Sequence, residues 1–419
     1  MKICVFGTTL QAGVIAGLFA EYGHQVAWCP QVRLEKQSSV HYQDTNLNQL
    51  IQKQISDDVL KLVNLKGIDF KSEIFVFSFN PTEFDQAIAL AEELKTQPVI
   101  HPKLMINGST FGLQGTEKLK QILNSDHWAY LPDTIQEGNA VESFVDLKQI
   151  IVGVDHSETQ TLVQELLRPF FQLKHQYLFM PFLDAEFTKL SISGMLATRI
   201  SYMNDMAQVA EKLNIDIQNV KQGLAADSRI GATYLSPGVG FGGENFSHDI
   251  LTLTGTVAGS GIKSQLLDQV WTINEQQKEI LFRKLWNYYQ GQLSGKIVAL
   301  WGASFKENTS SIDHSPIHAM LTALWAQGAI VQLHDPQALD RVKHLYGDRA
   351  DLILYEDQYK ATEQAHALCI LTAWKQYWSP DYHQLLLKMA HPLILDGRNI
   401  LNPDFVKTQG FAYQGVGRV

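Results

Sequence analysis

The sequence has few of the features that mark secreted, membrane-spanning or disulfide-rich proteins. Only three of its 419 residues are cysteines, and Cys4, Cys29 and Cys369 lie far apart without a CxxC pair. This usage excludes a disulfide framework and suits a reducing compartment, so we expect a cytoplasmic protein. No uninterrupted apolar run reaches the roughly 18 residues of a membrane span, so we expect no membrane partner.

An excess of positive charge is also missing. The chain has 43 acidic and 34 basic residues, a formal charge of −9, and no long basic block, so we expect no nucleic-acid partner. Apolar residues make up 45% and charged residues 18%, which excludes disorder as the main state. At roughly 150 residues per domain, the length predicts about three domains.

The amino-terminal segment MKICVFGTTLQAGVIAGLFA raises the question of a signal peptide. Thr8, Thr9 and Gln11 interrupt its apolar run, so the pattern favours a strand, a turn and a helix over Gln11–Tyr22 instead.

Strands and helical patterns alternate at both ends of the chain, which predicts βαβ units and parallel sheets. The stretch between them, Asp184 to about Leu285, is mostly helical in pattern with a glycine-rich interruption. We expect strands at Lys2–Phe6, Gln25–Cys29, Ile74–Phe79, Ile106–Gly108, Ala129–Leu131, Ile150–Val154, Ile297–Trp301, Ile330–Leu333, Ala367–Leu371 and Leu393–Leu395.

The first glycine loop departs from the pattern of a dinucleotide site. Gly7 fits the tight turn and Ala12 is tolerable at the third glycine position, but Thr9 stands where backbone approaches the pyrophosphate. The second strand ends at Pro30 without the carboxylate that binds ribose, and the next acid is Glu35. Two interpretations stay open: an NAD site, or a Rossmann-like domain that binds dinucleotide weakly or not at all.

Motifs in the middle of the chain carry the most information. Ala185–Lys189 reads AEFTK, Arg229–Gly231 reads RIG, and Pro237–Asp249 reads PGVGFGGENFSHD. In this order they resemble the UDP-glucose/GDP-mannose dehydrogenase family. Matching segments in the expected order extend the resemblance over nearly the whole chain: Ser109–Thr116, Pro132–Gly138, Ser304–Thr309, Asp335–Pro336, Asp396–Asn399 and Tyr413–Arg418.

The resemblance implies an α/β fold of two Rossmann-like parallel-sheet domains joined by a helical dimerisation domain. We place the NAD-type domain at 1–182, the helical domain at 183–291 and the sugar-nucleotide domain at 292–419. The family oxidises the sugar C6 alcohol to a carboxylate and reduces two NAD. A cysteine thiolate traps the intermediate aldehyde as a thiohemiacetal.

In this alignment the nucleophilic cysteine becomes Asn245, while Asp249 is kept and a neighbouring lysine becomes His248. A carboxamide cannot supply the covalent intermediate. The resemblance implies further catalytic roles for Lys189, which stabilises oxyanion character, and for Thr110 and Glu137, which hold and position water. Asp133 and Ser193 take the places of a glutamate and an asparagine on the substrate side.

The substrate side keeps more of the family pattern. The resemblance places Lys306, Arg398, Tyr234 and Gly242 near the sugar nucleotide, and it has Arg229 supplied across a dimer interface. Lys306 and Arg398 suit a diphosphate because they are cations.

Against the coenzyme, Asp313 replaces an arginine that faces the NAD pyrophosphate in the family. His314 and His318 could share a metal by their spacing, but Ser315 and Pro316 predict a helix start that leaves His314 outside. We therefore expect no metal site.

Each assignment has a purely structural alternative. Lys189 could be a solvated helix residue, Glu137 a carboxylate near a helix amino terminus, and Asn245 and Asp249 shapers of a loop. Gly242 could be required by a tight loop without contacting a phosphate. Three hypotheses remain: a degenerate family member that binds a nucleotide sugar (UDP-sugar) as a homodimer or larger assembly, a working dehydrogenase with non-cysteine chemistry, and a structural or assembly partner without ligand.

Overall fold

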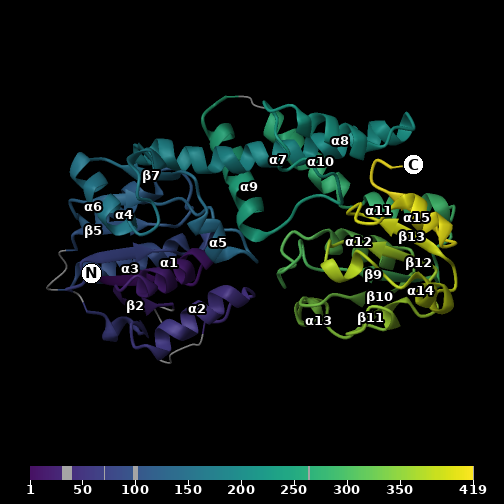
Figure 1. The fold of residues 1–419 in the computed structure, drawn as a ribbon, viewed down its shortest axis with the longest axis horizontal. Helices are drawn as coiled ribbons and strands as arrows, with labels where there is room; N and C mark the ends of the chain where they lie inside the picture. Colours follow the sequence, from purple (N-terminus) through teal and green to yellow (C-terminus); the bar gives the residue numbers. More distant parts are fainter. Residues whose placement is uncertain (31–39, 70, 98–101, 263–264, 419) are drawn as a thin grey trace. The chain divides into compact units, whose positions relative to one another are not determined.

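The computed structural model describes residues 1–30, 40–69, 71–97, 102–262 and 265–418, so Glu35 lies outside the described part. The chain divides into two compact units, Met1–Ile192 and Ser193–Val419. Each unit is built around its own sheet (Figure 1).

The sheet of the first unit has the strand order β3-β2-β1-β4-β5-β6-β7-β8. Neighbouring strands are parallel except β6 and β7, which pair antiparallel. The order reverses at β1 and β4, as in dinucleotide-binding folds, so ligands would be expected at the carboxyl ends of these strands. The strands are β1 Lys2–Phe6, β2 Gln25–Cys29, β3 Leu60–Leu62, β4 Ile74–Phe77, β5 Leu104–Asn107, β6 Trp128–Tyr130, β7 Ile150–Val154 and β8 Tyr177–Met180.

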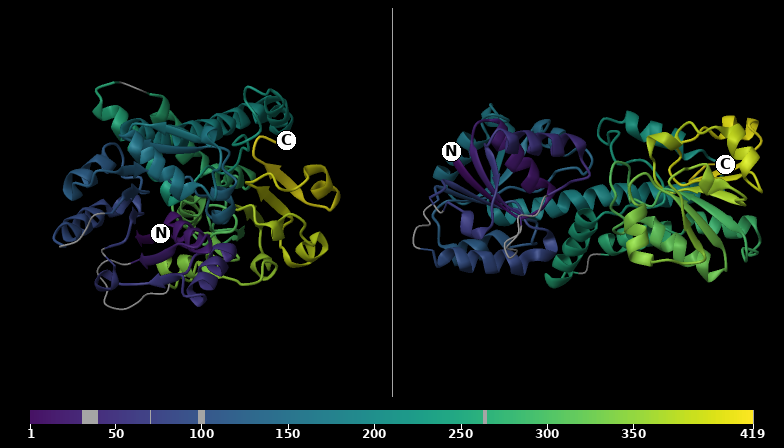
Figure 2. Two further views of the ribbon diagram at one scale, coloured as in Figure 1. Left: turned by 60° about the vertical axis from the view of Figure 1, so that its left-hand side comes forward. Right: turned by 90° about the horizontal axis from the view of Figure 1, so that it is seen from below.

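Helices cover both faces of this sheet, and Figure 2 gives two further views of the layers. One face packs against α1, α2, α5 and α6, and the other against α3, α4 and the start of α7. The helices are α1 Leu10–Glu21, α2 Thr45–Ser56, α3 Phe84–Lys95, α4 Gly115–Leu123, α5 Ala140–Val145, α6 Ser157–Leu167 and α7 Phe182–Lys212, which continues into the second unit.

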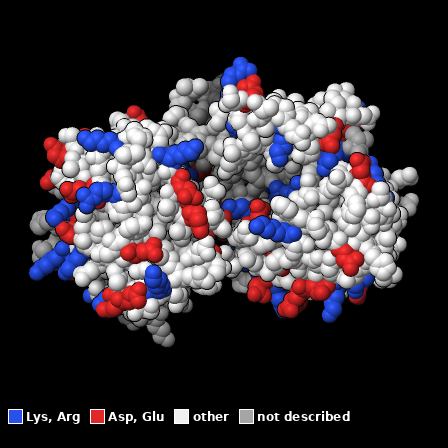
Figure 3. Space-filling model, viewed as in Figure 1, with Lys and Arg blue, Asp and Glu red and all other residues white. Residues whose placement is uncertain are grey.

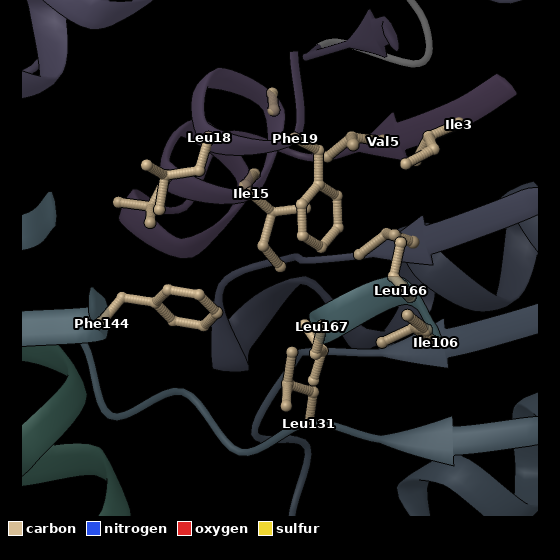
Figure 4. Close-up of a cluster of buried hydrophobic side chains, with 14 of the residues drawn as sticks. Ile3, Val5, Ile15, Leu18, Phe19, Ile106, Leu131, Phe144, Leu166 and Leu167 are labelled. Atoms are coloured by element: carbon tan, nitrogen blue, oxygen red, sulfur yellow. The ribbon is translucent and has the colours of Figure 1, made fainter. Parts of the chain in front are cut away.

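The larger core of the first unit lies under α1. Figure 4 shows Ile15 and Phe19 of α1 converging with Val5 of β1, Phe144 of α5 and Leu166 of α6. Because α1 lies between the sheet and neighbouring helices, almost all of its residues are buried. Removing this many apolar side chains from water is the main stabilising contribution to the fold.

The sheet of the second unit is parallel, with the order β11-β10-β9-β12-β13-β14. Its strands are β9 Ile297–Trp301, β10 Ile330–His334, β11 Leu352–Leu354, β12 Ala367–Ile370, β13 Leu393–Asp396 and β14 Ala412–Gly415. The helices are α8 Ile217–Ala226, α9 Glu244–Gly259, α10 Leu266–Gln277, α11 Ile280–Tyr288, α12 Pro316–Ala326, α13 Leu339–Tyr346, α14 Tyr382–Lys388 and α15 Pro403–Thr408.

The α/β class with two sheets and a helical middle is confirmed. Four short strands, β3, β8, β11 and β14, were not predicted from the sequence, nor was the antiparallel pair. The segment predicted as a strand over Ile74–Phe79 ends at Phe77, and the next two residues bond to loops: the Ser78 hydroxyl pairs with Thr9, and the Phe79 amide donates to the Ser109 hydroxyl.

Charged side chains of both signs intermingle over each unit on the face shown in Figure 3. Among the described residues, no helix is long and apolar enough to cross a membrane. Within the same part of the chain, no group of three or more His, Cys, Asp or Glu is placed to hold a metal ion.

Candidate functional site

The loop between β1 and α1 is held by side chains of neighbouring elements. Gly7 has a φ of 105°, and a side chain there would overlap the Ser78 carbonyl, so this turn requires glycine. Trp28 Nε1 donates to the Gly7 carbonyl over 2.9 Å. Thr9 caps α1 by accepting from the Ala12 amide at 3.1 Å, and its hydroxyl also pairs with the Ser78 hydroxyl.

These residues fit a dinucleotide only in part. Gly7 makes the tight turn, and the fully buried Ala12 allows close packing of helix on strand. At the second position, however, Thr9 has a branched side chain, and buried Pro30 directly after β2 offers no carboxylate for a ribose. These two positions therefore lack the glycine and the carboxylate of the general dinucleotide-binding pattern.

The segment after β5 contains Thr110 and is anchored to α7. Thr110 is buried. The Glu186 carboxylate accepts the amide hydrogens of Gln114 at 2.6 Å and Thr116 at 2.9 Å, and so caps α4 from another element. Burial raises the pKa of Glu186 above its ordinary value, and the two amide donors oppose that rise. Glu186 thus links the segment that carries Thr110 to the helix that carries Lys189.

The segment after β6 contains Asp133 and Glu137, both half-buried. Asp133 Oδ1 accepts the Ile135 amide at 3.0 Å, which closes a tight turn. Gly138 follows with a φ of 81°, and α5 begins at Ala140. Because β1, β5 and β6 run in the same direction, these residues lie at the same edge of the sheet as the glycine loop.

Lys189 and Ser193 lie one turn apart on α7. Lys189 is half-buried, and Ser193 is buried and donates to Asp249 Oδ2 over 2.7 Å. Asp249, in α9, is also almost completely buried. The structure therefore joins Ser193 and Asp249 directly.

The glycine-rich loop before α9 is tightly packed and held by amide side chains. Asn274 both accepts from and donates to the backbone of Phe241, and Gln277 Nε2 donates to the Gly238 carbonyl at 2.7 Å. A side chain on Gly242 would lie 2.6 Å from the His314 carbonyl oxygen. These contacts favour the tight-loop alternative for Gly242. Sequence analysis missed Asn274 and Gln277, which are polar positions on the buried side of α10.

Asn245, which the sequence resemblance aligns with a cysteine, lies exposed in the first turn of α9. Nearby His248 is half-buried, and burial lowers its pKa. The three cysteines of the chain are buried, and none of them is in a disulfide. Burial raises the pKa of Cys4 to about 11 and of Cys29 to about 12.

The same cause raises the pKa of Cys369 in β12 far above the ordinary value. Protonated, enclosed thiols are poor nucleophiles.

Arg398 holds three loops of the second unit together. Its Nε donates to the Leu371 carbonyl at 2.7 Å, Nη2 to Phe305 at 3.1 Å and Nη1 to Gly240 at 3.4 Å. Burial lowers its pKa to about 10. Half-buried Lys306 follows Phe305, with its ammonium 5.6 Å from the centre of the Phe305 ring. The structure thus brings Arg398, Lys306 and the glycine-rich loop together.

Arg229 and Tyr234 lie on the loop after α8. Arg229 is exposed, and its guanidinium pairs with Asp227 of the same loop at 2.6 Å. Tyr234 is 42% exposed with a φ of 58°, a strained conformation for an aromatic residue.

Asp313 accepts a hydrogen bond from the Ser311 hydroxyl at 2.6 Å, and its Oδ2 lies 3.9 Å from Arg341 Nη1.

Two family models match most of the second half of the chain. The UDP-glucose/GDP-mannose dehydrogenase family, central domain, matches residues 183–276, and the UDP binding domain of the same family matches 299–403. The UDP-glucose 6-dehydrogenase of Pseudomonas aeruginosa is 31% identical over 100% of this chain and 98% of that protein. The chain belongs to the UDP-glucose/GDP-mannose dehydrogenase family.

Other relatives and solved structures agree with this family. UDP-glucose 6-dehydrogenase TuaD of Bacillus subtilis is 26% identical, covering 100% of this chain and 93% of that protein. A UDP-glucose dehydrogenase from Pyrobaculum islandicum superposes with a TM-score of 0.87 at 23% identity, covering 100% and 98% of the two chains. A UDP-D-ManNAc dehydrogenase from Pyrococcus horikoshii gives 0.83 at 20%, covering 100% and 99%. These structural likenesses show the shared fold.

The described part of the chain has polar and cationic groups at the candidate site, and its three cysteines are all buried. Lys189, Ser193 and Asp249 provide charge and hydrogen bonding, and Lys306 provides a cation beside a glycine-rich loop. The arrangement can hold an anionic ligand in the second unit. It offers no nucleophile at Asn245 for covalent capture of an aldehyde.

Proposed function

We propose that this family member binds a nucleotide sugar, a UDP-sugar by preference, and does not carry out the four-electron oxidation of the sugar. The observation that carries the proposal is Asn245 in the first turn of α9. In this proposal the chain acts as a ligand-binding homologue in polysaccharide precursor metabolism.

Support for nucleotide-sugar binding comes from the second unit. The family's UDP binding domain matches residues 299–403, which include Lys306 and Arg398. We assign the diphosphate to the Lys306 ammonium, because Arg398 already donates from each of its three nitrogens to backbone carbonyls. Arg398 then acts by fixing the loops around Lys306, which prepares the site before the ligand arrives.

The chemistry of the Asn245 side chain supports the proposal that the sugar is not oxidised. Thiolate attack on an aldehyde makes the thiohemiacetal from which a second hydride can leave, and an amide nitrogen has no comparable lone pair. Cys369, the cysteine of the second unit, lies in the core under β12 and has no exposed surface.

Thermal unfolding in the presence of ligands tests the binding proposal. A ligand that binds only the folded chain raises its stability with concentration. We expect UDP-glucose or another UDP-sugar to raise the melting temperature progressively, and GDP-mannose to do so less. If no nucleotide sugar moves the transition, the proposal fails and the assembly role without ligand is favoured.

A second candidate is an active NAD-dependent nucleotide-sugar 6-dehydrogenase that uses water in place of the thiol. The Ser193–Asp249 bond favours it, because it keeps a carboxylate oriented one helical turn after Asn245. Glu137 would then position water for the aldehyde. Growth of the NADH absorbance band with a UDP-sugar and NAD would establish this candidate and contradict the first.

We further propose a homodimer and the three-domain division at 182/183 and 291/292, both from the family resemblance. Several large apolar side chains of α7 are exposed, which supports an intermolecular contact there: Leu183, Phe187, Ile192, Met195, Tyr202 and Val209. Light scattering on the purified chain should give twice the monomer mass, and a monomer mass would contradict the dimer.

A further inference from the structure

A buried polar cluster lies at the carboxyl edge of the first sheet, between β1 and β4. Its members are Thr9 from the glycine loop, Gln11 from the first turn of α1 and Ser78 from the end of β4. They are 7%, 1% and 0% exposed. The Thr9 and Ser78 hydroxyls pair, the Ser78 hydroxyl bonds Gln11 Oε1 at 3.3 Å, and Gln11 Nε2 donates to the Leu131 carbonyl at 3.1 Å.

The cluster spans the place where a dinucleotide fold receives its ligand. The strand order reverses between β1 and β4, and ligands of such sheets bind outside the carboxyl ends of the strands at that point. A side chain on Gly108, directly after β5, would overlap Gln11 Oε1, and Leu131 directly follows β6. The Gln11 carboxamide therefore reaches across the ends of β4, β5 and β6.

One amide at the amino terminus of α1 already has a partner within the chain. Thr9 Oγ1 accepts the Ala12 amide hydrogen, one of the groups that an anion at a helix amino terminus would use. On the other side of the loop, the Tyr42 hydroxyl donates to the carbonyls of Thr8 and Thr9 at 3.2 and 2.9 Å. The lack of a side chain on Gly13 leaves room for the Tyr42 ring, because a Cβ atom at position 13 would lie 2.6 Å from a carbon of that ring.

We propose that Thr9, Ser78 and Gln11 form an internal substitute for a coenzyme pyrophosphate and exclude dinucleotides from this crevice. A dinucleotide could enter only by breaking the cluster and leaving buried polar groups such as the Leu131 carbonyl without partners, which is unfavourable. Thr9 and Gln11 are thus the residues that determine coenzyme affinity. This inference rests on the proposed function, in which oxidation is lost, but concerns the other unit.

Titration of the full-length chain with NADH, followed by its fluorescence, tests the inference. The variants are Thr9→Gly, Gln11→Ala and the double variant, compared with the wild type. Glycine removes the branched side chain, and alanine withdraws the carboxamide from the ends of β4 to β6. We expect the double variant to bind NADH at least about tenfold more tightly than the wild type, equal to about 1.4 kcal/mol. Each single variant should gain less.

A matched control makes the same kinds of substitution on α6, at Gln160→Ala and Thr161→Gly, and should leave NADH affinity unchanged. An equal gain in this control, or wild-type affinity as high as that of the double variant, overturns the proposal. Ser78→Ala tests the cluster without altering the glycine loop, should the double variant not fold. It should raise NADH affinity modestly, and an unchanged affinity in both variants contradicts the proposal.

Thermal stabilisation by UDP-glucose, measured on the same proteins, separates this inference from the proposed function. Retained UDP-glucose binding without any gain in NADH binding removes the inference and leaves the proposed function standing. A gain in NADH binding in variants that do not bind UDP-glucose supports the inference and contradicts the proposed function.

Discussion

At the scale of single residues, the proposed absence of covalent catalysis rests on position 245. Asn245 is exposed in the first turn of a helix, where partial positive charge favours an anion. A cysteine at this place would have a lowered pKa and high reactivity, whereas the chain's own cysteines are buried and protonated. Our proposal that the oxidation is absent therefore depends on the side chain at this position.

This contrast can be measured with a thiol reagent. In the native wild type, Cys4, Cys29 and Cys369 should react slowly because burial keeps them protonated and enclosed. Asn245→Cys should add one thiol that reacts at least about tenfold faster at neutral pH. Unfolding in urea serves as the control, since all thiols should then react alike. Rapid labelling of the native wild type would contradict the burial argument.

Arg398 gives a second prediction at this scale. Arg398→Lys replaces a planar group that donates to three carbonyls by one that cannot reach them all, so buried acceptors lose partners. We expect a loss of about 2 kcal/mol or more in the free energy of unfolding, measured by urea titration. The control Arg349→Lys alters an exposed pair with Asp351 and should lower the free energy of unfolding much less. Equal losses would contradict the assigned role.

At the scale of elements, the carboxylate of Glu186 connects α7 to the start of α4. Its pKa is raised in the folded chain, chiefly by burial, from an ordinary value of 4.5. The folded state therefore holds this proton more tightly than the unfolded state. The resulting stabilisation is fully present below pH 4.5 and is lost as the pH rises through the folded-state pKa.

Glu186→Gln should abolish this dependence on pH. The urea midpoints of the wild type and the variant are measured over a range of pH. As the pH rises from about 4.5, the wild type should lose stability relative to the variant. Below about pH 4.5 the variant, which accepts only one of the two amide hydrogens, should be less stable by about 1 kcal/mol, and this deficit should shrink as the pH rises. A wild-type advantage that grows with pH over this range would show the opposite sign and contradict the raised pKa.

Much of this element-level structure could be predicted from the sequence. The strands Lys2–Phe6 and Ile297–Trp301 are almost entirely apolar and each is followed by a glycine, and both are found with the predicted bounds. Ser315 caps α12 and Pro316 is its first residue, as predicted. By contrast, β3 and β11 are three residues long and have a charged or exposed middle, so their patterns carry little information.

The candidate site was less accessible to prediction. The family resemblance identified Lys306 and Arg398 as candidate site residues. It could not show that Arg398 donates hydrogen bonds to the backbone of three loops. Gln11 and Ser78 belong to no motif, and their contact depends on β1 and β4 becoming neighbours in the sheet. Roles that arise from such long-range pairing appear only once the chain is folded.

At the scale of the whole molecule, the two units have separate hydrophobic cores. If a UDP-sugar binds the second unit, its stabilisation should follow the linkage relation, about 2.7 kcal/mol at one hundred times the dissociation constant. Calorimetric unfolding over a range of UDP-glucose concentrations checks this. NAD at equal concentrations should produce no comparable shift, and a shift as large would contradict the assignment of a self-filled crevice.

The most direct measurement is chromatographic analysis of the products formed when the purified chain is incubated with UDP-glucose and NAD. The account predicts bound but unchanged UDP-glucose and no uronate. Accumulation of UDP-glucuronate with two NADH for each sugar would contradict it.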